Sequence, residues 1–345
     1  MARIDVTVRG AGIFGLACAH ACATRGARVR VIDRAGIAAG ASGGVVGALA
    51  PHTPDAWNAK KAFQLAALLE AGAYWAGVDA RSGISSGYAR LGRLQPVADD
   101  RALSLARARE ASAAGLWQGR ADWRVVRATA GWGPVSPTGW LIHDTLTARI
   151  APRAACHSLA GAIRDLGGEI VIGEGAEAGA VIDATGHDGL AALAADTGRP
   201  AGTGVKGQAA VFGLDRRDAP QVFADGVHIV PHADGTVAVG STSETEFADP
   251  TATDALLDDV IARAVAHCPE LAGAPVLARW AGMRPRARSR APMLGPWPGR
   301  PGRYIANGGF KIGLAMAPAC AGLLADLVLE GRDAIPEAFR VEASL

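Results

Sequence analysis

Lysine, cysteine and long apolar runs are all scarce in this chain of 345 residues. Only four of its 35 basic residues are lysines, and the formal net charge is +2. So small a net charge excludes a bulk field that would attract nucleic acid or an anionic membrane. The five cysteines are too few and too scattered to form the disulfide framework of a small secreted protein.

No apolar run is expected to cross a bilayer, and no signal peptide is expected before the first strand. We therefore expect a cytoplasmic protein with no membrane partner. The eight histidines are scattered, and neither H-E-x-x-H nor paired C-x-x-C motifs occur, so no metal site is expected. Half of the residues are hydrophobic, which is enough for one large core or two moderate ones.

What the chain has instead is glycine, concentrated first in an N-terminal turn. An apolar run leads directly into Gly10, Gly12 and Gly15, in G-x-G-x-x-G spacing. An Ala-rich helical stretch follows, and a second apolar strand ends on Asp33. In a dinucleotide-binding unit the glycines allow a tight turn, a close approach to pyrophosphate and close helix packing. The helix N-terminus favours a phosphate, and the acid accepts hydrogen bonds from a ribose. The order of these parts predicts a dinucleotide site.

The rest of the chain alternates between helical and extended patterns. Helices are expected at about 56–77, 99–115, 152–166, 253–267 and 317–329. Strands are expected at 88–97, 140–144, 169–172, 180–184, 205–214, 228–230, 236–240, 276–280 and 304–306. The Arg/Pro-rich stretch 282–295 is expected to be a loop. Gly40, Ser42 and Gly44 match the G-x-S-x-G pattern of hydrolases, but the strand and helix that flank such a serine are not expected there. The pattern predicts an α/β fold with a parallel sheet and a separate antiparallel sheet.

Six segments together resemble a known family. They are VRGAGIFGLACA, GASGGVVGALAP, VKGQAAVFGL, HIVPHADGTVAVGSTSE, WAGMRPRARSRAPMLG and NGGFKIGLAMAP. In this order they are similar to FAD-dependent D-amino-acid oxidase-type enzymes, especially glycine oxidase and monomeric sarcosine oxidase. The resemblance implies a Rossmann-like FAD-binding domain that is discontinuous in sequence, with a mixed-sheet substrate domain. We assign residues 1–55, 141–205 and 276–345 to the first, and residues 56–140 and 206–275 to the second.

The resemblance also implies that FAD, not NAD, is the cofactor. Sarcosine oxidases attach flavin to a cysteine in the segment that matches 282–295, which has none here, so non-covalent FAD is expected. Residues 169–181 are shorter than usual in the family, which leaves the adenine contact open. The implied cofactor contacts are Gly10, Gly12, Ile13, Phe14, Gly15, Asp33, Arg34, Ala41, Ser42, Gly47, Ala48, Gly186, Arg284, Gly308, Gly309, Phe310, Lys311 and Ile312.

By the same resemblance, the reaction is oxidation of the C–N bond of an amino acid or N-substituted amino acid. Hydride passes to flavin N5 and an imine results. Lys311 is the expected anchor of the substrate carboxylate, because lysine or arginine occupies the matching position in these families. Arg284 and His52 are further catalytic candidates. Arg284 and Arg286 would bind a second carboxylate or brace the flavin, and His52 would alternatively have a capping or surface role.

Three alternatives stay open. Ala238 occupies the place of an oxygen-activating lysine of sarcosine oxidases, so the electron acceptor is oxygen or another oxidant. The four arginines between 284 and 290 suggest nucleic-acid binding. The stretch GALAPHTPDAWN is also similar to part of a flavin domain that modifies a tRNA wobble uridine. An NAD-linked or non-catalytic Rossmann protein is the last alternative. The sequence does not name the amino acid or its chirality.

Overall fold

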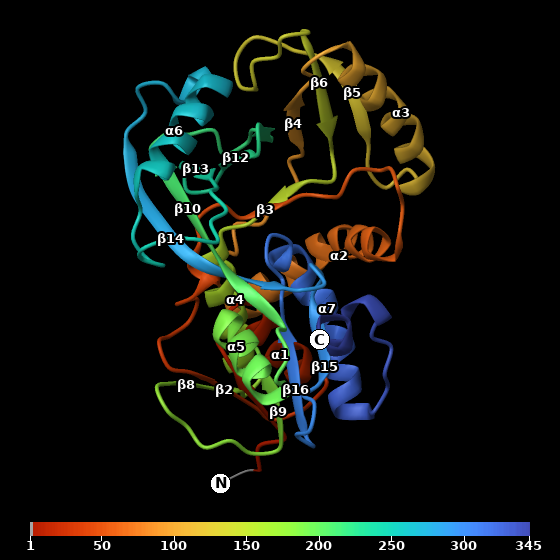
Figure 1. Cartoon of the computed structure of the whole chain (residues 1–345), viewed down its shortest axis with the longest axis vertical. Coiled ribbons are helices and arrows are strands. Elements are labelled where there is room, and N and C mark those ends of the chain that lie inside the picture. The colour runs from red at the N-terminus through yellow and green to blue at the C-terminus, as the bar shows by residue number, and fades with distance from the viewer. Residues whose placement is uncertain (1–2) are drawn as a thin grey trace.

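The N-terminal glycine-rich unit has the strand–helix–strand structure that the sequence predicts. In a computed structural model, which describes residues 3–345, β1 (Val6–Arg9), α1 (Ile13–Thr24) and β2 (Val29–Asp33) follow one another. β1 and β2 are parallel neighbours, with Val6 opposite Val29. The alternate residues Val29 and Val31 are almost fully buried, and so is most of α1. This first unit therefore forms the centre of the lower lobe in Figure 1.

The lower lobe contains a six-stranded sheet in which only one pair of strands is antiparallel. β15 (Met293–Pro296) and β16 (Arg303–Asn307) form that pair at one edge. From there the order continues through β9 (Ala180–Asp183), β1 and β2 to β8 (Glu169–Ile172). Residues 173–179 join β8 to β9 without a further strand. Parallel strands of this kind need helical crossovers that cover the sheet faces.

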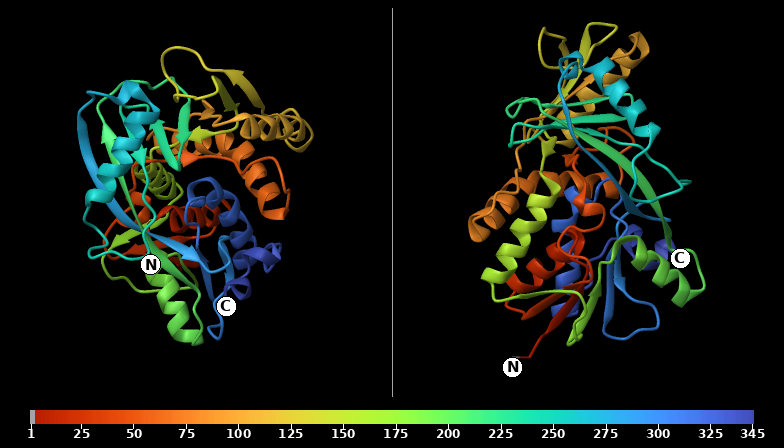
Figure 2. Two further views of the ribbon diagram at one scale, coloured as in Figure 1. Left: turned by 45° about the horizontal axis from the view of Figure 1, so that its top comes forward. Right: turned by 90° about the vertical axis from the view of Figure 1, so that its left-hand side faces the viewer.

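Helices α1, α4 (Pro152–Asp165) and α7 (Gly313–Glu330) pack on this sheet, and α2 (Ala59–Ser82) packs on α4 and α7. The right-hand view of Figure 2 shows α1, α2 and α4 gathered on one side of the lobe. The expectation that no apolar run is long enough to cross a bilayer does not hold for α7, which is long and apolar enough by length and composition. Here it is a core helix, because it packs along α1 and its residues Met316, Cys320 and Leu324 are fully buried.

The upper lobe is built on an eight-stranded mixed sheet. Its order is β14 (Val276–Ala287), β10 (Gly202–Phe212), β13 (Val237–Gly240), β12 (Val227–Pro231), β11 (Gln221–Ala224), β4 (Arg93–Pro96), β6 (Trp140–Asp144) and β5 (Trp123–Arg127). Only β11 and β4 pair in parallel. α6 (Ala255–His267) covers β10, β12 and β13, and α3 (Asp100–Leu116) packs on β5.

Two long strands connect the lobes. β10 and β14 are antiparallel partners, and Figure 1 shows both running from the upper lobe down to the lower one. α5 (Gly186–Thr197), which follows β9, packs against the lower part of this pair. A two-stranded sheet of β3 (Ala48–Leu49) and β7 (Ala148–Arg149) lies between the lobes. The remaining elements are the 3₁₀ turns Ala41–Gly43, Pro269–Leu271, Glu337–Phe339 and Val341–Ser344.

The largest difference from the sequence analysis is the stretch expected to be a loop. β14 does not end at Trp280 but continues through Ala287, paired with β10 as far as Gly202. Pro285, which suggests a loop, is tolerated because β14 is the edge strand and needs no donor on its outer side. On that side the Pro285 carbonyl accepts the N–H of Phe310, 3.1 Å away. The supposed loop is therefore a rigid support for the C-terminal glycine segment.

Helix ends also differ from expectation, for identifiable reasons. α2 begins at Ala59, because the Asn58 side chain accepts the Lys61 N–H, and it ends at Gly83 in the left-handed conformation. α7 begins at Gly313, four residues before the expected start, and contains Pro318. α5, β5 and β11 were not predicted, and the glycines at the start of α5 disguise its helical pattern. The strand expected at 88–97 is shorter, at Arg93–Pro96.

Sheet membership bears on the proposed division into domains. β14, which begins the third segment assigned to the FAD-binding domain, shares a sheet with strands of the upper lobe, and β6 does the same. α2, from the segment assigned to the substrate domain, packs on helices of the lower lobe. The domain boundaries remain predictions, and the two lobes share β10 and β14.

Candidate functional site

The glycine turn after β1 is shaped by close backbone contacts. Gly10 has φ of +104°, and a Cβ there would lie 2.4 Å from the carbonyl oxygen of Ala184 at the end of β9. A Cβ on Gly15 would lie 1.9 Å from the Gly10 carbonyl oxygen. Gly12 is different, because its nearest neighbour would be the Ser42 Oγ at 3.1 Å. Gly10 and Gly15 are thus required by close packing of the backbone, whereas Gly12 leaves an open backbone surface beside Ser42.

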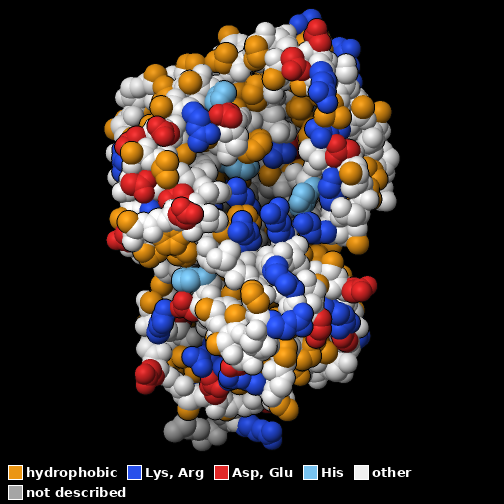
Figure 3. All heavy atoms as spheres, viewed as in Figure 1, with side chains coloured by type: hydrophobic (Ala, Val, Ile, Leu, Met, Phe, Trp, Pro, Cys, Tyr) orange, Lys and Arg blue, Asp and Glu red, His pale blue; other side chains and the backbone are white. Residues whose placement is uncertain are grey.

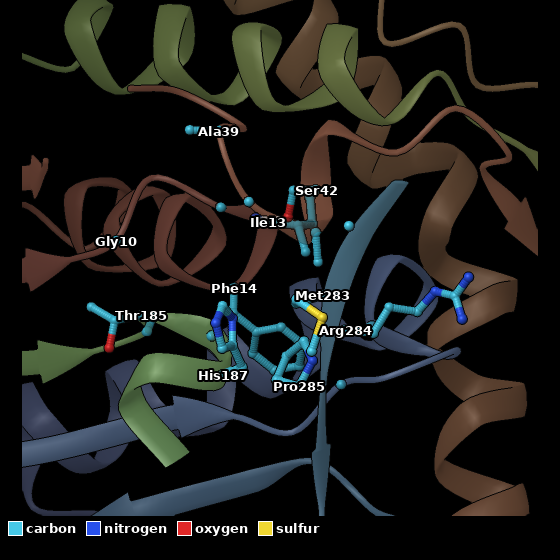
Figure 4. A pocket seen from close by; sticks show the side chains of 18 of the residues that line it. Gly10, Ile13, Phe14, Ala39, Ser42, Thr185, His187, Met283, Arg284 and Pro285 are labelled. Atoms are coloured by element: carbon cyan, nitrogen blue, oxygen red, sulfur yellow. Dashed lines mark hydrogen bonds between the residues drawn. The ribbon is translucent and has the colours of Figure 1, made fainter. Parts of the chain in front are cut away.

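That open surface belongs to a cavity of about 1220 Å³ between the lobes. This exceeds the ~300–1,000 Å³ of ordinary ligand pockets, as a dinucleotide requires. Figure 3 shows a hollow at the waist of the molecule where Lys and Arg side chains gather. In Figure 4, Gly10 and Thr185 lie at one end of the view, Arg284 at the other, and Phe14 and Met283 between them.

The N-terminus of α1 is prepared for an anionic group. The Ser42 Oγ accepts the Ile13 N–H at 2.9 Å, and the two residues lie together in Figure 4. Within residues 3–345 the N–H groups of Phe14 and Gly15 have no acceptor. A helix N-terminus with free donors beside an uncovered glycine fits a pyrophosphate. Ser42 therefore orients the helix end and is not preceded by a strand, which argues against a hydrolase nucleophile.

All the acidic residues that line the cavity lie at the β1–β2–β9 end. They are Asp33, Glu174, Glu177, Asp183 and Asp188. The Asp33 carboxylate already accepts N–H groups from Ala11, at 2.7 Å, and from Ala35 and Gly36. A carboxylate has further acceptor positions, so a ribose hydroxyl at Asp33 is still possible. Arg34 forms an ion pair with Asp188 at the same end.

Arg284 lies at the opposite end, where the cavity has no acidic lining residue. It donates to the Ser241 Oγ at 2.7 Å and to the Thr242 carbonyl oxygen at 3.1 Å. Burial lowers the pKa of Arg284 to about 10, and Glu244 offsets part of that effect. The Glu244 carboxylate lies 3.5 Å from the ammonium of Lys206, which is only 1% exposed. Lys206 also pairs with Asp254 at 3.2 Å, so it balances Glu244 only in part, and Arg284 has no carboxylate within ion-pair distance among the described residues.

A glycine makes room for Arg284. A Cβ on Gly207, in β10, would lie 1.6 Å from one of the terminal nitrogens of Arg284. Gly207 is paired with Gly282 across the two long strands. The guanidinium therefore lies directly over the β10 backbone, and any side chain at position 207 would displace it.

Lys311 is the second cation at this end, and its side chain remains accessible within the cavity. Its ammonium lies 5.7 Å from the centre of the Phe310 ring and, among the described residues, has no carboxylate within ion-pair distance. Partial burial lowers the pKa of Lys311, and the nearby charge of Arg284 lowers it further. The interpretation of Lys311 as a solvated surface lysine is thereby weakened, because it faces the same cavity as Arg284.

A smaller cavity of about 160 Å³ adjoins the first, and Ala48, His228 and Lys311 line both. His52 lies here and not in the large cavity, with its ring Nδ1 and its backbone N–H both bonded to the side-chain amide oxygen of Gln64. Burial lowers the pKa of His52, so the imidazole is neutral at pH 7.

Most of the predicted contacts line one of the two cavities. The large cavity is lined by Gly10, Gly12, Ile13, Phe14, Asp33, Arg34, Ala41, Ser42, Gly47, Ala48, Gly186, Arg284, Gly309, Phe310 and Lys311. The small cavity adds His52 and Ile312. Gly15 and Gly308 line neither, because Gly15 packs on Gly10 and Gly308 on Ala287 and Ala291.

The sequence analysis missed several residues that build the site. Asn307 is 3% exposed, and it donates to the Gly186 carbonyl oxygen at 2.7 Å while accepting the Gly308 N–H at 2.8 Å. It thereby ties the β9–α5 turn to the C-terminal glycine segment, and its place directly before two glycines was a usable signal. Ser241 and Thr242, which hold Arg284, gave no signal in sequence.

The arginine run from 284 to 290 does not form one basic face. Arg284 enters the cavity, Arg286 lies over the Phe310 ring at 5.8 Å, and Arg288 donates to the Leu345 carbonyl oxygen. Arg284 and Arg286 share a face of β14, but Arg288 and Arg290 lie beyond the strand, which ends at Ala287, so the four charges are dispersed. This arrangement gives no support to a nucleic-acid surface.

Comparison with known protein families identifies the chain. The sequence profile of the family described as FAD dependent oxidoreductase, the D-amino-acid oxidase type, matches residues 5–327. The chain therefore belongs to this family, as its six motif segments predicted. It is an enzyme, an FAD-dependent oxidoreductase, and the cavity fits the long cofactor that the family uses. The alternative of an NAD-linked or non-catalytic protein receives no support.

Curated relatives include glycine oxidases. That of Pseudomonas putida is 41% identical over 125 residues, which are 36% of this chain and 34% of that enzyme. That of Geobacillus kaustophilus is 27% identical over 375 aligned positions, covering 94% of this chain and 93% of that enzyme. The match to the first thus spans about a third of its length, and the match to the second nearly all of it.

Solved structures confirm the fold class. The crystal structure of glycine oxidase from Geobacillus kaustophilus has a TM-score of 0.85 at 21% identity and covers 99% of both chains. The iminodiacetate oxidase of a Chelativorans species has a TM-score of 0.84 at 24% identity and covers 97% of this chain and 98% of its own. At such identities the likeness concerns the fold alone.

The glycine cradle leads to a prediction about cofactor content. In Gly12→Val the new side chain would press on Ser42 and fill the surface that faces the cavity, so the purified protein should lose most of its yellow flavin colour. Ser42→Ala, which removes a hydrogen bond but adds no bulk, is the control and should lose less. Visible absorbance and the circular dichroism of both variants give the answer. A folded Gly12→Val protein with full flavin content would show that the cofactor does not pass this turn.

The contact of Gly207 with Arg284 leads to a second prediction. Gly207→Ala should leave the fold intact, because the clashing atom is the end of a flexible side chain, but it should displace the guanidinium. Binding of a simple carboxylate such as butyrate should then weaken about tenfold, or ~1.4 kcal/mol. Gly213→Ala, directly after β10 and next to Pro275 and Leu277, is the matched control. Equal affinities in the two variants would remove Arg284 from the ligand site.

Proposed function

We propose that this enzyme uses non-covalent FAD to oxidise the C–N bond of an amino acid or N-substituted amino acid. The observation that carries the proposal is the pair of cations, Arg284 and Lys311, at one end of the large cavity. Neither has a carboxylate partner among the described residues. Charged groups held away from bulk water favour an opposite charge, and a ligand carboxylate supplies one.

The two cations would hold the substrate differently. Arg284 is half-buried and fixed by Ser241 and Thr242, so its planar group suits a directional, two-point contact with a carboxylate. Lys311 is a more accessible point charge, and we expect it to contribute less. This ranking reverses the emphasis of the sequence analysis, in which Lys311 was the principal anchor.

The same charges help to prepare the amine. A substrate ammonium near two cations is disfavoured, so its pKa falls and the neutral amine is favoured. Neither neighbouring imidazole is a competent base at pH 7, because burial lowers the pKa of His228 to about 3 and lowers that of His52 as well. The proton therefore passes to water, and the protein contributes chiefly orientation and charge.

When bound, FAD supplies the oxidant, because it accepts hydride from the carbon that carries the amine and leaves an imine that water hydrolyses. A covalent flavin link is not part of the proposal. All five cysteines are buried, and none lines either cavity. Gly10, Gly12 and the α1 N-terminus would hold the pyrophosphate, and the Phe310 ring lies beside Lys311.

The relatives support the substrate class, since several carry the name glycine oxidase. The acceptor for the second half-reaction is oxygen or another oxidant. Ala238 is fully buried in β13 and does not line the cavity, so it offers that step no charged group. A tRNA substrate is not favoured by any contact in the structure.

The direct test is anaerobic bleaching of the flavin by amino acids, each paired with the amine that lacks the carboxylate. In Lys311→Met, kcat/KM for the amino acid should fall about 10- to 100-fold, or ~1.4–2.8 kcal/mol. This expected loss lies between the values typical of exposed and of buried ion pairs, because the Lys311 side chain is accessible. The amine without a carboxylate should be affected much less, since it never used the charge.

Lys60→Met is the matched control, because Lys60 only donates to the Arg290 carbonyl oxygen at 3.2 Å and does not line either cavity. It should behave as the wild type. Equal losses for both members of a substrate pair in Lys311→Met would remove Lys311 as a carboxylate anchor. Flavin that no amino acid bleaches would contradict the proposed function.

The lowered pKa of Lys311 leads to a prediction about pH. Below this pKa the ammonium is charged and attracts a carboxylate; above it the amine is neutral and the attraction is lost. The dissociation constant of butyrate, which has no amine of its own, should therefore rise at a pH below the ordinary lysine pKa of about 10.4. Lys311→Arg should extend tight binding to higher pH. An identical pH profile in both proteins would assign the titration to another group.

A further inference from the structure

The small cavity next to Lys311 has the features of a side-chain pocket. It shares the lining residues Ala48, His228 and Lys311 with the large cavity. Its lining also includes Arg93 from β4, His52 and Gln64. A group anchored between Arg284 and Lys311 in the large cavity therefore has a second compartment directly beside it.

Arg93 is the charged group of this compartment. It is 5% exposed, and its Nε donates to the Asp144 carboxylate at 2.9 Å. Its two terminal amino groups have no acceptor within residues 3–345, although a guanidinium carries five N–H donors. Asp144 is fully buried, and it also accepts the Thr147 N–H at 2.8 Å. The pair with Asp144 thus fixes the orientation of Arg93 and leaves its outer edge free.

No lining residue of the small cavity is acidic. His228 lies close enough to Arg93 and Lys311 that both lower its pKa, although burial lowers it most. The imidazole is therefore neutral at pH 7, and its buried Nδ1 has no hydrogen-bond partner. With His52 also neutral, the charges that line the compartment are the cations Arg93 and Lys311. Such a lining disfavours a basic side chain, and an apolar side chain would leave the free N–H donors of Arg93 without an acceptor.

Resting on the proposed function, we propose that the substrate carries a second carboxylate, held in the small cavity by Arg93. A volume of about 160 Å³ equals roughly five water molecules at ~30 Å³ each, which is the size of a short acidic side chain. Arg93 can donate two parallel hydrogen bonds from its outer edge, the geometry that a carboxylate accepts best. The substrate class is then an acidic amino acid or an N-carboxyalkyl amino acid.

The test compares acidic substrates with their isosteric amides. Both enantiomers of aspartate and glutamate are set against asparagine and glutamine, and N-carboxymethylglycine against N-(carbamoylmethyl)glycine. The wild type should prefer the acid of each pair about 100-fold in kcat/KM, mainly through KM. Arg93→Gln with Asp144→Asn removes both charges together but keeps hydrogen-bonding shapes, so no buried charge is left unpaired. In this double variant the acid should lose its advantage while the amide is unchanged.

A second readout does not depend on turnover. Succinate and glutarate should raise the melting temperature of the wild type more than butyrate does, and the double variant should lose this difference. The control is Arg81→Gln with Asp165→Asn, which removes an ion pair of 2.8 Å between α2 and α4 that lines neither cavity. The control should keep the preference for dicarboxylates.

The outcomes separate the two proposals. If neutral amino acids bleach the flavin as efficiently as acidic ones, the second-carboxylate proposal is overturned and the proposed function stays intact. Equal losses of kcat/KM for acid and amide in the double variant would have the same meaning. Bleaching by neither class would overturn the proposed function, and the melting-temperature comparison would then decide alone whether Arg93 recognises an acidic group.

Discussion

Two cations facing one cavity without a carboxylate partner are the constraint on which this account depends. Burial lowers the pKa of both groups, and the charge of Arg284 lowers that of Lys311 further, so keeping both charged is costly. Glu244 lies beside Lys206, which also pairs with Asp254, and it is not within ion-pair distance of Arg284. A charge imbalance maintained in this way favours an anionic ligand, and the family supplies the chemistry that such a ligand would undergo.

The architecture explains how the cations reach the cofactor cavity. The glycine turn after β1 belongs to the lower lobe, whereas Arg284 lies on a strand of the upper sheet. β10 and β14 extend from one lobe to the other, so residues of both sheets line a single cavity. The segment that carries Lys311 is held to the outer edge of β14 by the bond from Phe310 to Pro285. A long, paired edge strand thus fixes the relative positions of cofactor cradle and substrate anchors.

Local patterns made part of this structure predictable. The order of strand, three glycines, helix, strand and Asp33 identified the dinucleotide unit, because each part acts on its immediate neighbours. The ends of β6 and β8 were also predicted correctly from their apolar patterns. The family motifs led to most of the residues that line the cavities.

Other features depend on contacts between distant parts of the chain and gave no local signal. Pro285 suggested a loop, and only pairing with β10 shows that it lies on a strand edge. The importance of Gly207 follows from a side chain 77 positions away, and Arg93 reaches the second cavity because Asp144 orients it. The ranking of Arg284 above Lys311 required their accessibilities and partners, which residue types alone do not reveal.

The most direct test of the central claim is a crystal structure of the yellow, purified protein with bound butyrate. The account predicts that the butyrate carboxylate accepts hydrogen bonds from the Arg284 guanidinium and lies within ion-pair distance of the Lys311 ammonium, at the end of the cavity away from Asp33. A carboxylate bound elsewhere, with Arg284 and Lys311 still unpartnered or turned to solvent, would contradict it.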